Sequence, residues 1–475
     1  MKLHLALLLC TGALLPAAAP RPNVLMVVVD DLNLNLGAYG ETSVRSPNID
    51  RLAARGVRFD SAHAQYPLCN PSRVSFLSGR RPETSGVYIL GTPARTALAD
   101  AVMLPQLFRQ NGYFTAGAGK VFHNAKFSDR ASWDFYEDNA TQDEGEKAAM
   151  AARYGREGGG DGDGRPAWQM LDGDGSRTRD GVNSATIRRL IGEKSAAGTP
   201  FFLALGFHKP HLPWTAPKRF FDLYPETGVT PPPEPPMRDI PAIALQTELS
   251  GFAQPSSRSG AIRAYHACIS FIDHLLGQVL DELDRRDLTR NTLIVFFSDH
   301  GFHLGDHGGL WAKLSAFRAS TRVPLILAGP GVPAGVAVGS PVELIDVYPT
   351  LADLAGLKAP PGLEGRSLRT EFRGGKPAGH AYSLVYHYDV AANRDVVGRT
   401  VIGAGWRYTE WDGGRAGREF YRHAADPGEY ANLSADPSNA ASIEEARAQL
   451  GTLPPPKPGS ANRPRALDRE GKKAR

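Results

Sequence analysis

The chain has 475 residues, with 54 Lys or Arg, 50 Asp or Glu and a formal net charge of +4. Charge this evenly balanced gives no argument for nucleic-acid binding, and a hydrophobic fraction of 42% is enough for a sizeable core. The length allows two or three domains, although one large α/β unit could occupy most of it.

The first 19 residues have the pattern of a secretory signal peptide. Lys2 precedes an apolar run from Leu5 to Leu15, and Ala17-Ala18-Ala19 follows as a small-residue cleavage site. The run is too short to span a membrane, and no later segment is long enough. We therefore expect a mature chain that begins near Pro20, has no membrane span and is secreted or periplasmic.

Four apolar runs predict strands buried on both faces of a parallel sheet. They lie at residues 24–29, 113–118, 201–205 and 293–297. Each run is followed by ionisable side chains, namely Asp30 and Asp31, then Lys120 and His123, then His208, and finally Asp299 and His300. Ligands of α/β sheets bind at the carboxyl ends of strands. We therefore expect these side chains to converge on one pocket.

Amphipathic stretches between the runs predict helices that cover the sheet. They lie at residues 46–54, 104–110, 183–195, 265–283 and 346–356, and a further strand is expected at 324–327. Cys268 falls on the apolar face of the fourth helix, where we expect an inert core residue. The predicted fold is α/β, with a large mixed, mostly parallel sheet sandwiched by helices.

Two segments differ from this pattern. Residues 137–181 are rich in Gly and Asp and predict a long insertion or loop near the rim of the site. After Gly374-Gly375, short alternating runs at 382–388, 394–402, 406–410 and 419–421 predict an antiparallel sheet. The expected domains are a catalytic domain over 20–373, a C-terminal subdomain over 374–460 and a basic flexible tail over 461–475.

The stretch Cys69-Asn70-Pro71-Ser72-Arg73 looks like a loop that enters a helix. Pro71 falls near the first turn, where its missing N–H costs nothing, and a helix N-terminus favours an anion. We expect this helix to continue to Gly79-Arg80-Arg81 and to end at Pro82. Taken alone, Cys69 would more often be a small buried residue at a strand-to-helix turn, the commonest role of a free Cys.

The twelve residues from Cys69 to Arg80 resemble the signature of type I sulfatases. That signature is Cys, any residue, Pro-Ser-Arg, three residues, Leu, Ser or Thr, Gly, and Arg or Lys, and every fixed position is met. The likeness extends over residues 22–432, with dense matches at 112–123, 206–213 and 298–301. It is nearest to the iduronate-2-sulfatase-like branch. It implies an alkaline-phosphatase-like fold and a carbohydrate sulfatase, with a 2-O-sulfated uronic acid as the favoured substrate.

The resemblance also implies a modified side chain and a metal. A formylglycine-generating or anaerobic sulfatase-maturating enzyme would convert Cys69 to formylglycine, whose hydrate is the nucleophile in the family. The implied cation is Ca²⁺, with Mg²⁺ as the alternative, and oxygen-rich ligands suit either ion. The implied ligands are Asp30, Asp31, Cys69, Asp299 and His300.

The remaining roles come from the same resemblance. Arg73 would hold the hydrate, and Lys120 and Lys313 would clamp the sulfate oxygens. Asp299 would take the proton of the attacking hydroxyl and His208 would protonate the departing sugar oxygen. His123 would remove the proton of the second hydroxyl and so expel sulfate.

Three alternatives stay open at this stage. A phosphonate or phosphate monoester hydrolase needs similar positive clamps on the same fold, and a catalytically silent protein could bind polyanions. His211 and Trp214 either contact the sugar or belong to a packed loop beside prolines. For His303 and His307, which flank a Gly-rich loop, a structural role is the favoured interpretation.

Overall fold

The fold is described from a computed structural model of the chain. It describes residues 21–124, 127–138, 168–231, 233–247, 255–375, 379–389 and 393–457. The expected signal peptide, the basic tail and residues 139–167 of the expected insertion lie outside these ranges. Within them, no helix has the length and apolar character needed to cross a membrane.

A nine-stranded mixed sheet forms the centre of the molecule. Its strands follow the order β12-β2-β11-β8-β1-β6-β3-β4, and β13 also pairs with β2. β1 is parallel to both of its neighbours, whereas β11 is antiparallel to β2 and β8. The bounds are β1 Asn23–Val29, β2 Gly56–His63, β3 Phe114–Gly119, β4 Phe135–Glu137, β6 Phe201–Phe207, β8 Thr292–Ser298, β11 Arg322–Ala328, β12 Val336–Val338 and β13 Val342–Glu343.

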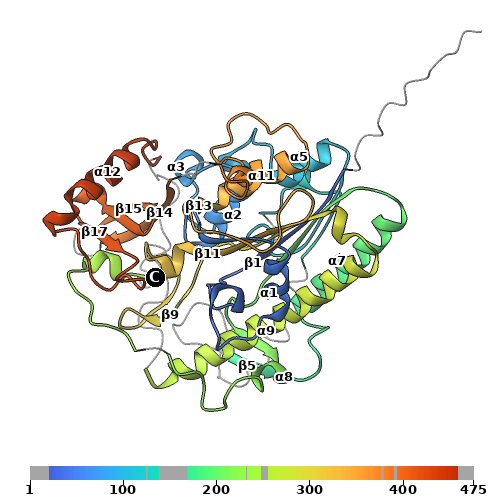
Figure 1. The fold of residues 1–475 in the computed structure, drawn as a ribbon, viewed down its shortest axis with the longest axis horizontal. Helices are drawn as coiled ribbons and strands as arrows, with labels where there is room; N and C mark the ends of the chain where they lie inside the picture. Colours follow the sequence, from blue (N-terminus) through green and yellow to red (C-terminus); the bar gives the residue numbers. More distant parts are fainter. Residues whose placement is uncertain are drawn as a thin grey trace, which may run out of the picture.

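Each face of this sheet has its own hydrophobic core, because successive side chains of a strand point to opposite faces. Leu25, Val27 and Val29 of β1 belong to one core, and Val24, Met26 and Val28 belong to the other. The first core is covered by α1 (Pro47–Ala54), α7 (Arg179–Ala196) and α9 (Pro255–Arg285). The second is covered by α2 (Cys69–Ser78), α5 (Leu104–Gln110) and α11 (Val347–Leu354). Figure 1 shows these two layers on either side of the strands, which confirms the predicted sandwich.

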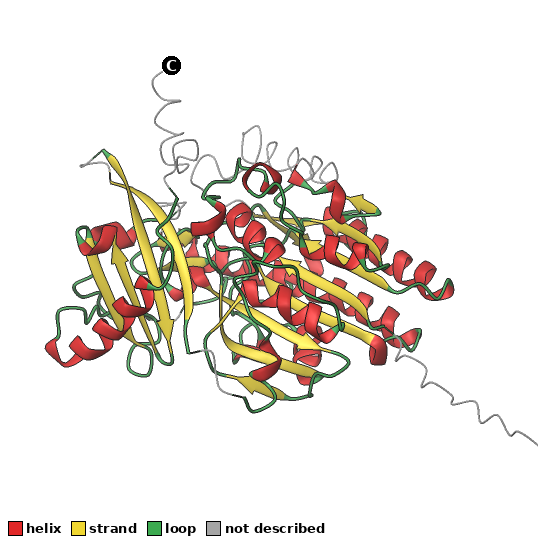
Figure 2. Cartoon of the chain, turned by 90° about the horizontal axis from the view of Figure 1, so that it is seen from above, coloured by secondary structure: helices red, strands yellow, loops and turns green. Residues whose placement is uncertain are grey.

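A second, four-stranded antiparallel sheet stands beside the first (Figure 2). Its strands are β14 (Ala381–Asp389), β15 (Arg394–Gly403), β16 (Trp406–Trp411) and β17 (Gly417–Arg422). Helix α12 (Ala440–Gly451) packs on it through Ala446 and Leu450. The predicted C-terminal antiparallel sheet is therefore confirmed. It meets the larger unit where Leu384 N donates to Gln65 O at 2.9 Å.

One prediction about local structure is wrong, and one long strand was not predicted. The helix after Cys69 ends at Ser78 rather than at Pro82, because Gly79 adopts a left-handed φ of 67° and caps it. Pro82 instead begins a short helix, α3 (Pro82–Ser85). Strand β2 was not predicted, because its half-buried Arg58 and Asp60 interrupt the apolar pattern.

The described end of the expected insertion is also regular structure. Strand β5 (Trp168–Leu171) pairs in parallel with β7 (Trp214–Pro217), which follows the loop after β6. Helix α7 then begins at Arg179, four residues before its predicted start. This end of the segment is therefore packed against the loop that carries His208 and His211.

Candidate active site

The first two acids of the site follow β1 directly. Asp30 and Asp31 are buried, with exposed fractions of 0% and 1%. Asp31 has a φ of 62°, a left-handed conformation that Asp adopts more readily than most residues. The turn brings the two consecutive carboxylates into one cluster, and the hydroxyl of Tyr265 on α9 holds the turn by donating to Asp31 O at 2.6 Å.

The parallel register of β1 and β8 places Asp299 and His300 beside Asp30 and Asp31. Val29 of β1 pairs with Ser298 of β8, and Asp299 N donates to Val29 O at 3.0 Å. His300 Nδ1 lies 3.0 Å from Gly301 O, a carbonyl that can only accept, so Nδ1 carries the proton. Nε2 therefore presents a lone pair, 3.3 Å from Cys69 Sγ and 3.5 Å from Asp31 Oδ1.

Helix α2 brings Cys69 and Arg73 to the same place. Cys69 is its first residue and is 2% exposed, and Arg73 lies one turn further on the same helix face. The Arg73 guanidinium lies 3.0 Å from Asp299 Oδ2 and 3.3 Å from Asp30 Oδ1. It also donates to the carbonyl oxygens of Lys120 and Val121. This fully buried side chain thus joins the ends of β1, β3 and β8.

Two lysines neutralise the first pair of acids. Lys120 follows β3, and its ammonium group bonds to Asp30. Lys313 Nζ lies 2.6 Å from Asp31 Oδ1. Both lysines are almost fully buried, so each ammonium is fixed in the site rather than solvated. The structure thus brings Asp30, Asp31, Lys120, Asp299, His300 and Lys313 together at one end of the sheet.

Three imidazoles complete the site. Ligand atoms of His208, His211 and Asp30 lie within 4.8 Å of one another, and the rings of His208 and His211 are 4.9 Å apart. Among the described residues, Nδ1 of His123 and Nδ1 of His208 are buried without a hydrogen-bond partner. Neither of these two ring nitrogens is therefore engaged by another described residue.

Burial and neighbouring charges shift the pKa values of the three acids in different directions. Burial raises the pKa of Asp31, and Asp30 and Asp299 add to the rise while Lys313 opposes it. Burial also raises the pKa of Asp299, to about 7, against the attraction of Arg73. For Asp30 the effect of burial is outweighed by positive charges, chiefly Lys120, which hold its pKa well below the usual range. Burial and mutual repulsion thus favour the protonated forms of Asp31 and Asp299, whereas Asp30 stays ionised.

The thiol and the imidazoles are held neutral. Burial raises the pKa of Cys69 well above its ordinary value, with Asp30 adding to the effect. Since the thiolate is the reactive form of cysteine, the unmodified thiol is a poor nucleophile at neutral pH. Burial lowers the pKa of His123 to about 3 and holds those of His208 and His300 well below 6.5. A neutral His300 with its lone pair inward is in the state that a metal ligand requires.

The residues present fit a divalent cation. Asp30, Asp31, Cys69 and His300 each offer one ligand atom, these atoms lie within 4.8 Å of one another, and all four residues are buried. Carboxylate oxygens suit a hard cation such as Ca²⁺. Asp299, also a predicted ligand, borders the group, with Oδ1 3.5 Å from His300 Nε2 and Oδ2 bound by Arg73.

One predicted substrate contact needs correction. Trp214 has an exposed fraction of 0% and packs in the hydrophobic core near Tyr265, Phe302 and Trp311. A buried indole cannot touch a sugar, so Trp214 is removed from the predicted contacts. His211 keeps its place, because its side chain is 12% exposed and its Nε2 lies 3.9 Å from Asp31 Oδ2.

Two positioning residues were not predicted. Asp180, in the first turn of α7, accepts hydrogen bonds from the backbone N–H groups of His208 and Lys209, at 2.7 and 2.9 Å. Tyr265 anchors the turn at Asp31, as described above. Asp180 lies within the Gly/Asp-rich segment and Tyr265 within an apolar helix face, so neither had a local signal of function.

Comparison with known proteins assigns this site to a family. Residues 22–357 match the sulfatase family, and residues 305–454 match the C-terminal family of N-sulphoglucosamine sulphohydrolase. The chain belongs to the sulfatase family. This sulfatase is 34% identical over 467 residues to a sulfatase of Formosa agariphila, covering 90% of this chain and 86% of that protein. It is 36% identical over 394 residues to the iduronate 2-sulfatase of Mus musculus, covering 71% and 69%.

The fold comparison agrees with this assignment. The phosphonate monoester hydrolase of Agrobacterium radiobacter superposes with a TM-score of 0.69, at 24% identity and with 90% of this chain and 96% of that chain covered. At that identity the likeness concerns the fold, and it confirms the expected alkaline-phosphatase-like architecture. The sulfatase is accordingly an enzyme, a sulfuric ester hydrolase.

Proposed function

We propose that this sulfatase removes 2-O-sulfate from a uronic acid residue of a sulfated carbohydrate, with a formylglycine made from Cys69 as its nucleophile. The observation that carries the proposal is the buried cluster in which Cys69 Sγ lies 3.3 Å from His300 and 3.4 Å from Lys313. The similarity to iduronate 2-sulfatase supports the position of the sulfate.

The modification and the metal supply what the unmodified chain lacks. The hydrate of formylglycine supplies one hydroxyl for attack and a second that permits release of sulfate, which an inert buried thiol cannot do. Asp30, Asp31, Asp299, His300 and the modified side chain at position 69 would hold a Ca²⁺ or Mg²⁺ ion, which would supply positive charge to stabilise the developing charge of the sulfate group.

The side chains around position 69 orient the reacting groups and move protons. Arg73 holds the modified side chain, and Lys120 and Lys313 present fixed ammonium groups to the sulfate oxygens. Asp299 accepts the proton of the attacking hydroxyl.

His123 and His208 handle the remaining two protons. His123 is neutral, with Nδ1 free among the described residues, so it is ready to accept the proton whose removal expels sulfate. His208 is also neutral in the free protein. It must therefore gain a proton when the anionic substrate binds nearby, since a negative charge favours the imidazolium. It then donates that proton to the departing sugar oxygen.

The proposed function also includes the oxidation of Cys69 and the export of the protein. The partner that oxidises Cys69 is a formylglycine-generating or anaerobic sulfatase-maturating enzyme. Residues 1–19 act as a signal peptide that sends the protein to the periplasm or the exterior. The boundaries near residues 373 and 460 separate the catalytic domain, the C-terminal subdomain and the basic tail.

The decisive experiment compares defined substrates on protein of known maturation. The mass of the peptide that contains Cys69 shows how much aldehyde is present, because the aldehyde is lighter than the thiol. Matured enzyme and a Cys69→Ala variant are then assayed on 2-O-sulfated uronate disaccharides, 6-O-sulfated glucosamine and a phosphonate monoester. We expect desulfation of the first substrate only, and none by the variant. Preference for the phosphonate ester, or activity without aldehyde, would overturn the proposal.

A further inference from the structure

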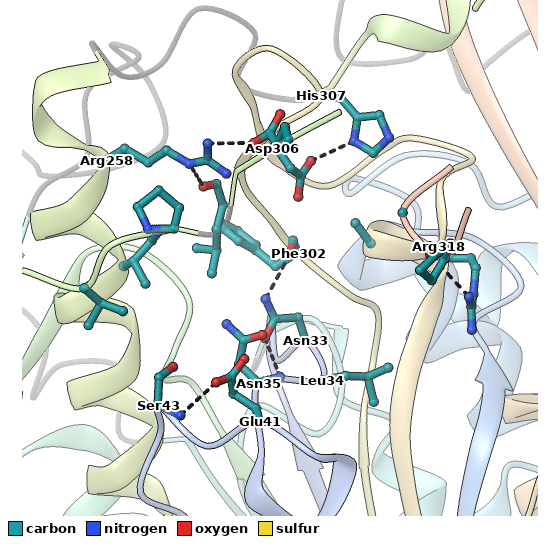
Figure 3. Close-up of a pocket in the computed structure, with 18 of the residues that line it drawn as sticks. Asn33, Leu34, Asn35, Glu41, Ser43, Arg258, Phe302, Asp306, His307 and Arg318 are labelled. Carbon is teal, nitrogen blue, oxygen red and sulfur yellow. Dashed lines mark hydrogen bonds and ion pairs between the residues drawn. The ribbon is translucent and has the colours of Figure 1, made fainter. Parts of the chain in front are cut away.

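A second group of potential metal ligands lies outside the candidate active site. It is carried by the hairpin of β9 (His303–Asp306) and β10 (Leu310–Ala312), which follows β8. Atoms of His303, Asp306 and His307 that could bind a metal lie within 4.8 Å of one another. Asp306 and His307 also line a cavity of about 660 Å³, and Figure 3 shows them together on one wall of it.

The turn of the hairpin brings these side chains together. Gly305, His307 and Gly308 all have left-handed φ angles, of 81°, 50° and 73°. Few residues other than Gly adopt this conformation, so the backbone at His307 is held by its surroundings. The turn directs His303, three positions before Asp306, and His307, one position after it, towards the carboxylate of Asp306.

The hydrogen bonds of His303 identify which ring nitrogen carries a proton. His303 Nε2 lies 2.7 Å from Ser315 Oγ, and Ser315 donates its own hydroxyl to Ser320 Oγ at 2.9 Å. Ser315 Oγ therefore accepts from His303, so Nε2 is protonated. His303 Nδ1 contacts Asp306 Oδ1. In the neutral ring, this Nδ1 has a lone pair.

His307 is arranged in the same way. Its Nε2 lies 3.2 Å from Glu429 O, a carbonyl that can only accept, so Nε2 donates. Its Nδ1 lies 3.1 Å from Asp306 Oδ1, the same oxygen that His303 contacts. The ring is stacked on Tyr430 at 4.4 Å and 5°, which fixes its orientation.

The Nδ1 atoms of His303 and His307 thus both face Asp306 Oδ1, while their Nε2 atoms donate to Ser315 Oγ and Glu429 O. The two rings, 0% and 5% exposed, are therefore aimed at one point beside Asp306 Oδ1. A cation at that point would be bound by both Nδ1 atoms and by the carboxylate of Asp306. Histidines that bind metals usually donate their second N–H to an oxygen acceptor, as both rings do here.

We propose that His303, Asp306 and His307 bind a divalent transition metal of the zinc class, at a site separate from the cluster around Cys69. Two imidazole nitrogens and one carboxylate suit Zn²⁺ better than Ca²⁺, which prefers oxygen ligands alone. The Asp306 side chain is 25% exposed towards the cavity, so solvent has access to the remaining coordination position. The nearby Arg258 is neutralised by Glu234 at 2.6 Å.

The site would join two parts of the molecule. His303 and Asp306 belong to the hairpin, whereas His307 contacts Glu429 and Tyr430, which follow the C-terminal sheet. A metal that fixes the His307 ring also fixes this contact. The bound ion therefore stabilises the docking of the C-terminal segment and takes no part in sulfate hydrolysis.

The test uses Co²⁺ as a visible probe on the full chain in excess Ca²⁺, so that the oxygen-rich site is occupied. Wild type, Cys69→Ser, His307→Gln and a control, His380→Gln, are titrated while the d–d absorption of nitrogen-ligated Co²⁺ is recorded. We expect one Co²⁺ per chain in wild type, Cys69→Ser and His380→Gln. We expect at least a tenfold weaker affinity in His307→Gln, and Zn²⁺ should raise the Tm of wild type but not of this variant.

Two results would overturn the proposal: no saturable Co²⁺ signal in wild type, or a signal lost with Cys69→Ser and kept in His307→Gln. If His307→Gln does not fold, Asp306→Asn replaces it. Anomalous diffraction from zinc-soaked crystals of wild type then decides independently. A peak at bonding distance from Nδ1 of His303 and His307 supports the site, and its absence refutes it.

Discussion

The ammonium nitrogen of Lys313 lies 3.4 Å from the Sγ atom of Cys69. The residues on both sides of Lys313, Ala312 and Leu314, have left-handed φ angles of 68° and 69°. Such conformations cost of order 1–3 kcal/mol for residues other than Gly. The fold retains them because Leu314 N is bonded to Pro67 O at 3.0 Å, next to the start of α2. A strained segment thus fixes a cation against the proposed nucleophile.

Replacing that cation should impair catalysis more than folding. We expect Lys313→Met to lower kcat/KM by about 10²- to 10³-fold, the usual cost of losing one group that stabilises transition-state charge. Steady-state kinetics on a sulfate ester, with circular dichroism to check folding, measure the effect. The matched control is Lys218→Met, since Lys218 is 62% exposed and pairs with Asp222 at the surface. Equal activity of the two variants would contradict the assigned role.

Removing the metal should abolish hydrolysis reversibly. We expect a chelator to inactivate the enzyme and Ca²⁺ to restore it. Asp31→Asn should lose both bound calcium and activity, by roughly 10²-fold or more, because a metal supplies several kcal/mol of charge stabilisation. Metal analysis and kinetics on the same samples test this. Asp281→Asn, at a 67% exposed surface position, should keep both, and an Asp31→Asn variant with wild-type calcium content would refute the ligand assignment.

A buried ion network should dominate the stability of the C-terminal unit. Arg407 is fully buried, with Nε 2.9 Å from Glu429 Oε1 and Nη2 3.2 Å from Glu419 Oε2. Arg407→Leu removes the guanidinium that neutralises two buried carboxylates, so we expect a loss of about 3–5 kcal/mol. Arg415→Leu, at a position 75% exposed, should change stability by no more than about 0.5 kcal/mol. Thermal and urea unfolding measure both, and similar melting of the two variants would show that the network contributes little.

His387 should make the protein less stable in acid. Burial lowers the pKa of His387 to about 3, whereas an unfolded His titrates near 6.5. Below pH 6.5 the unfolded state therefore binds more protons than the folded state, and stability falls as the pH falls. At pH 4 the loss is about 3 kcal/mol.

The variant His387→Phe isolates this effect, because Phe cannot titrate and can keep the stack on Trp411 at 5.0 Å. We expect the Tm difference between wild type and the variant to move in favour of the variant as the pH falls from 7 to 4. A difference that stays constant over this range would show that His387 is not held neutral.

The sequence predicted those parts of the site that follow from strand order. Asp30, Asp31, Asp299 and His300 each follow an apolar strand, and the carboxyl ends of parallel strands lie at the same edge of a sheet. The convergence of these four residues could therefore be predicted without knowing the structure of the loops. The helix that carries Cys69 and Arg73 was also predictable, because Pro71 marks its first turn.

The rest depended on packing between distant segments. The hydroxyl of Tyr265 reaches Asp31 across 234 positions of sequence, and Tyr265 appears in the sequence only as part of an apolar helix face. For Trp214 the sequence left two alternatives, a sugar contact or a packed loop beside prolines, and the burial of the indole in the core supports the second. Asp180 reaches the backbone of His208 only because α7 begins beside the loop after β6.

The burial of Cys69 limits the time during which the residue can be oxidised. A side chain with 2% of its surface exposed cannot enter the active site of another enzyme. The proposed oxidation must therefore finish before α2 closes onto the sheet, and the two processes compete in rate. A substitution that speeds folding without touching the site would then lower the yield of active enzyme, because more chains would close around an unconverted thiol.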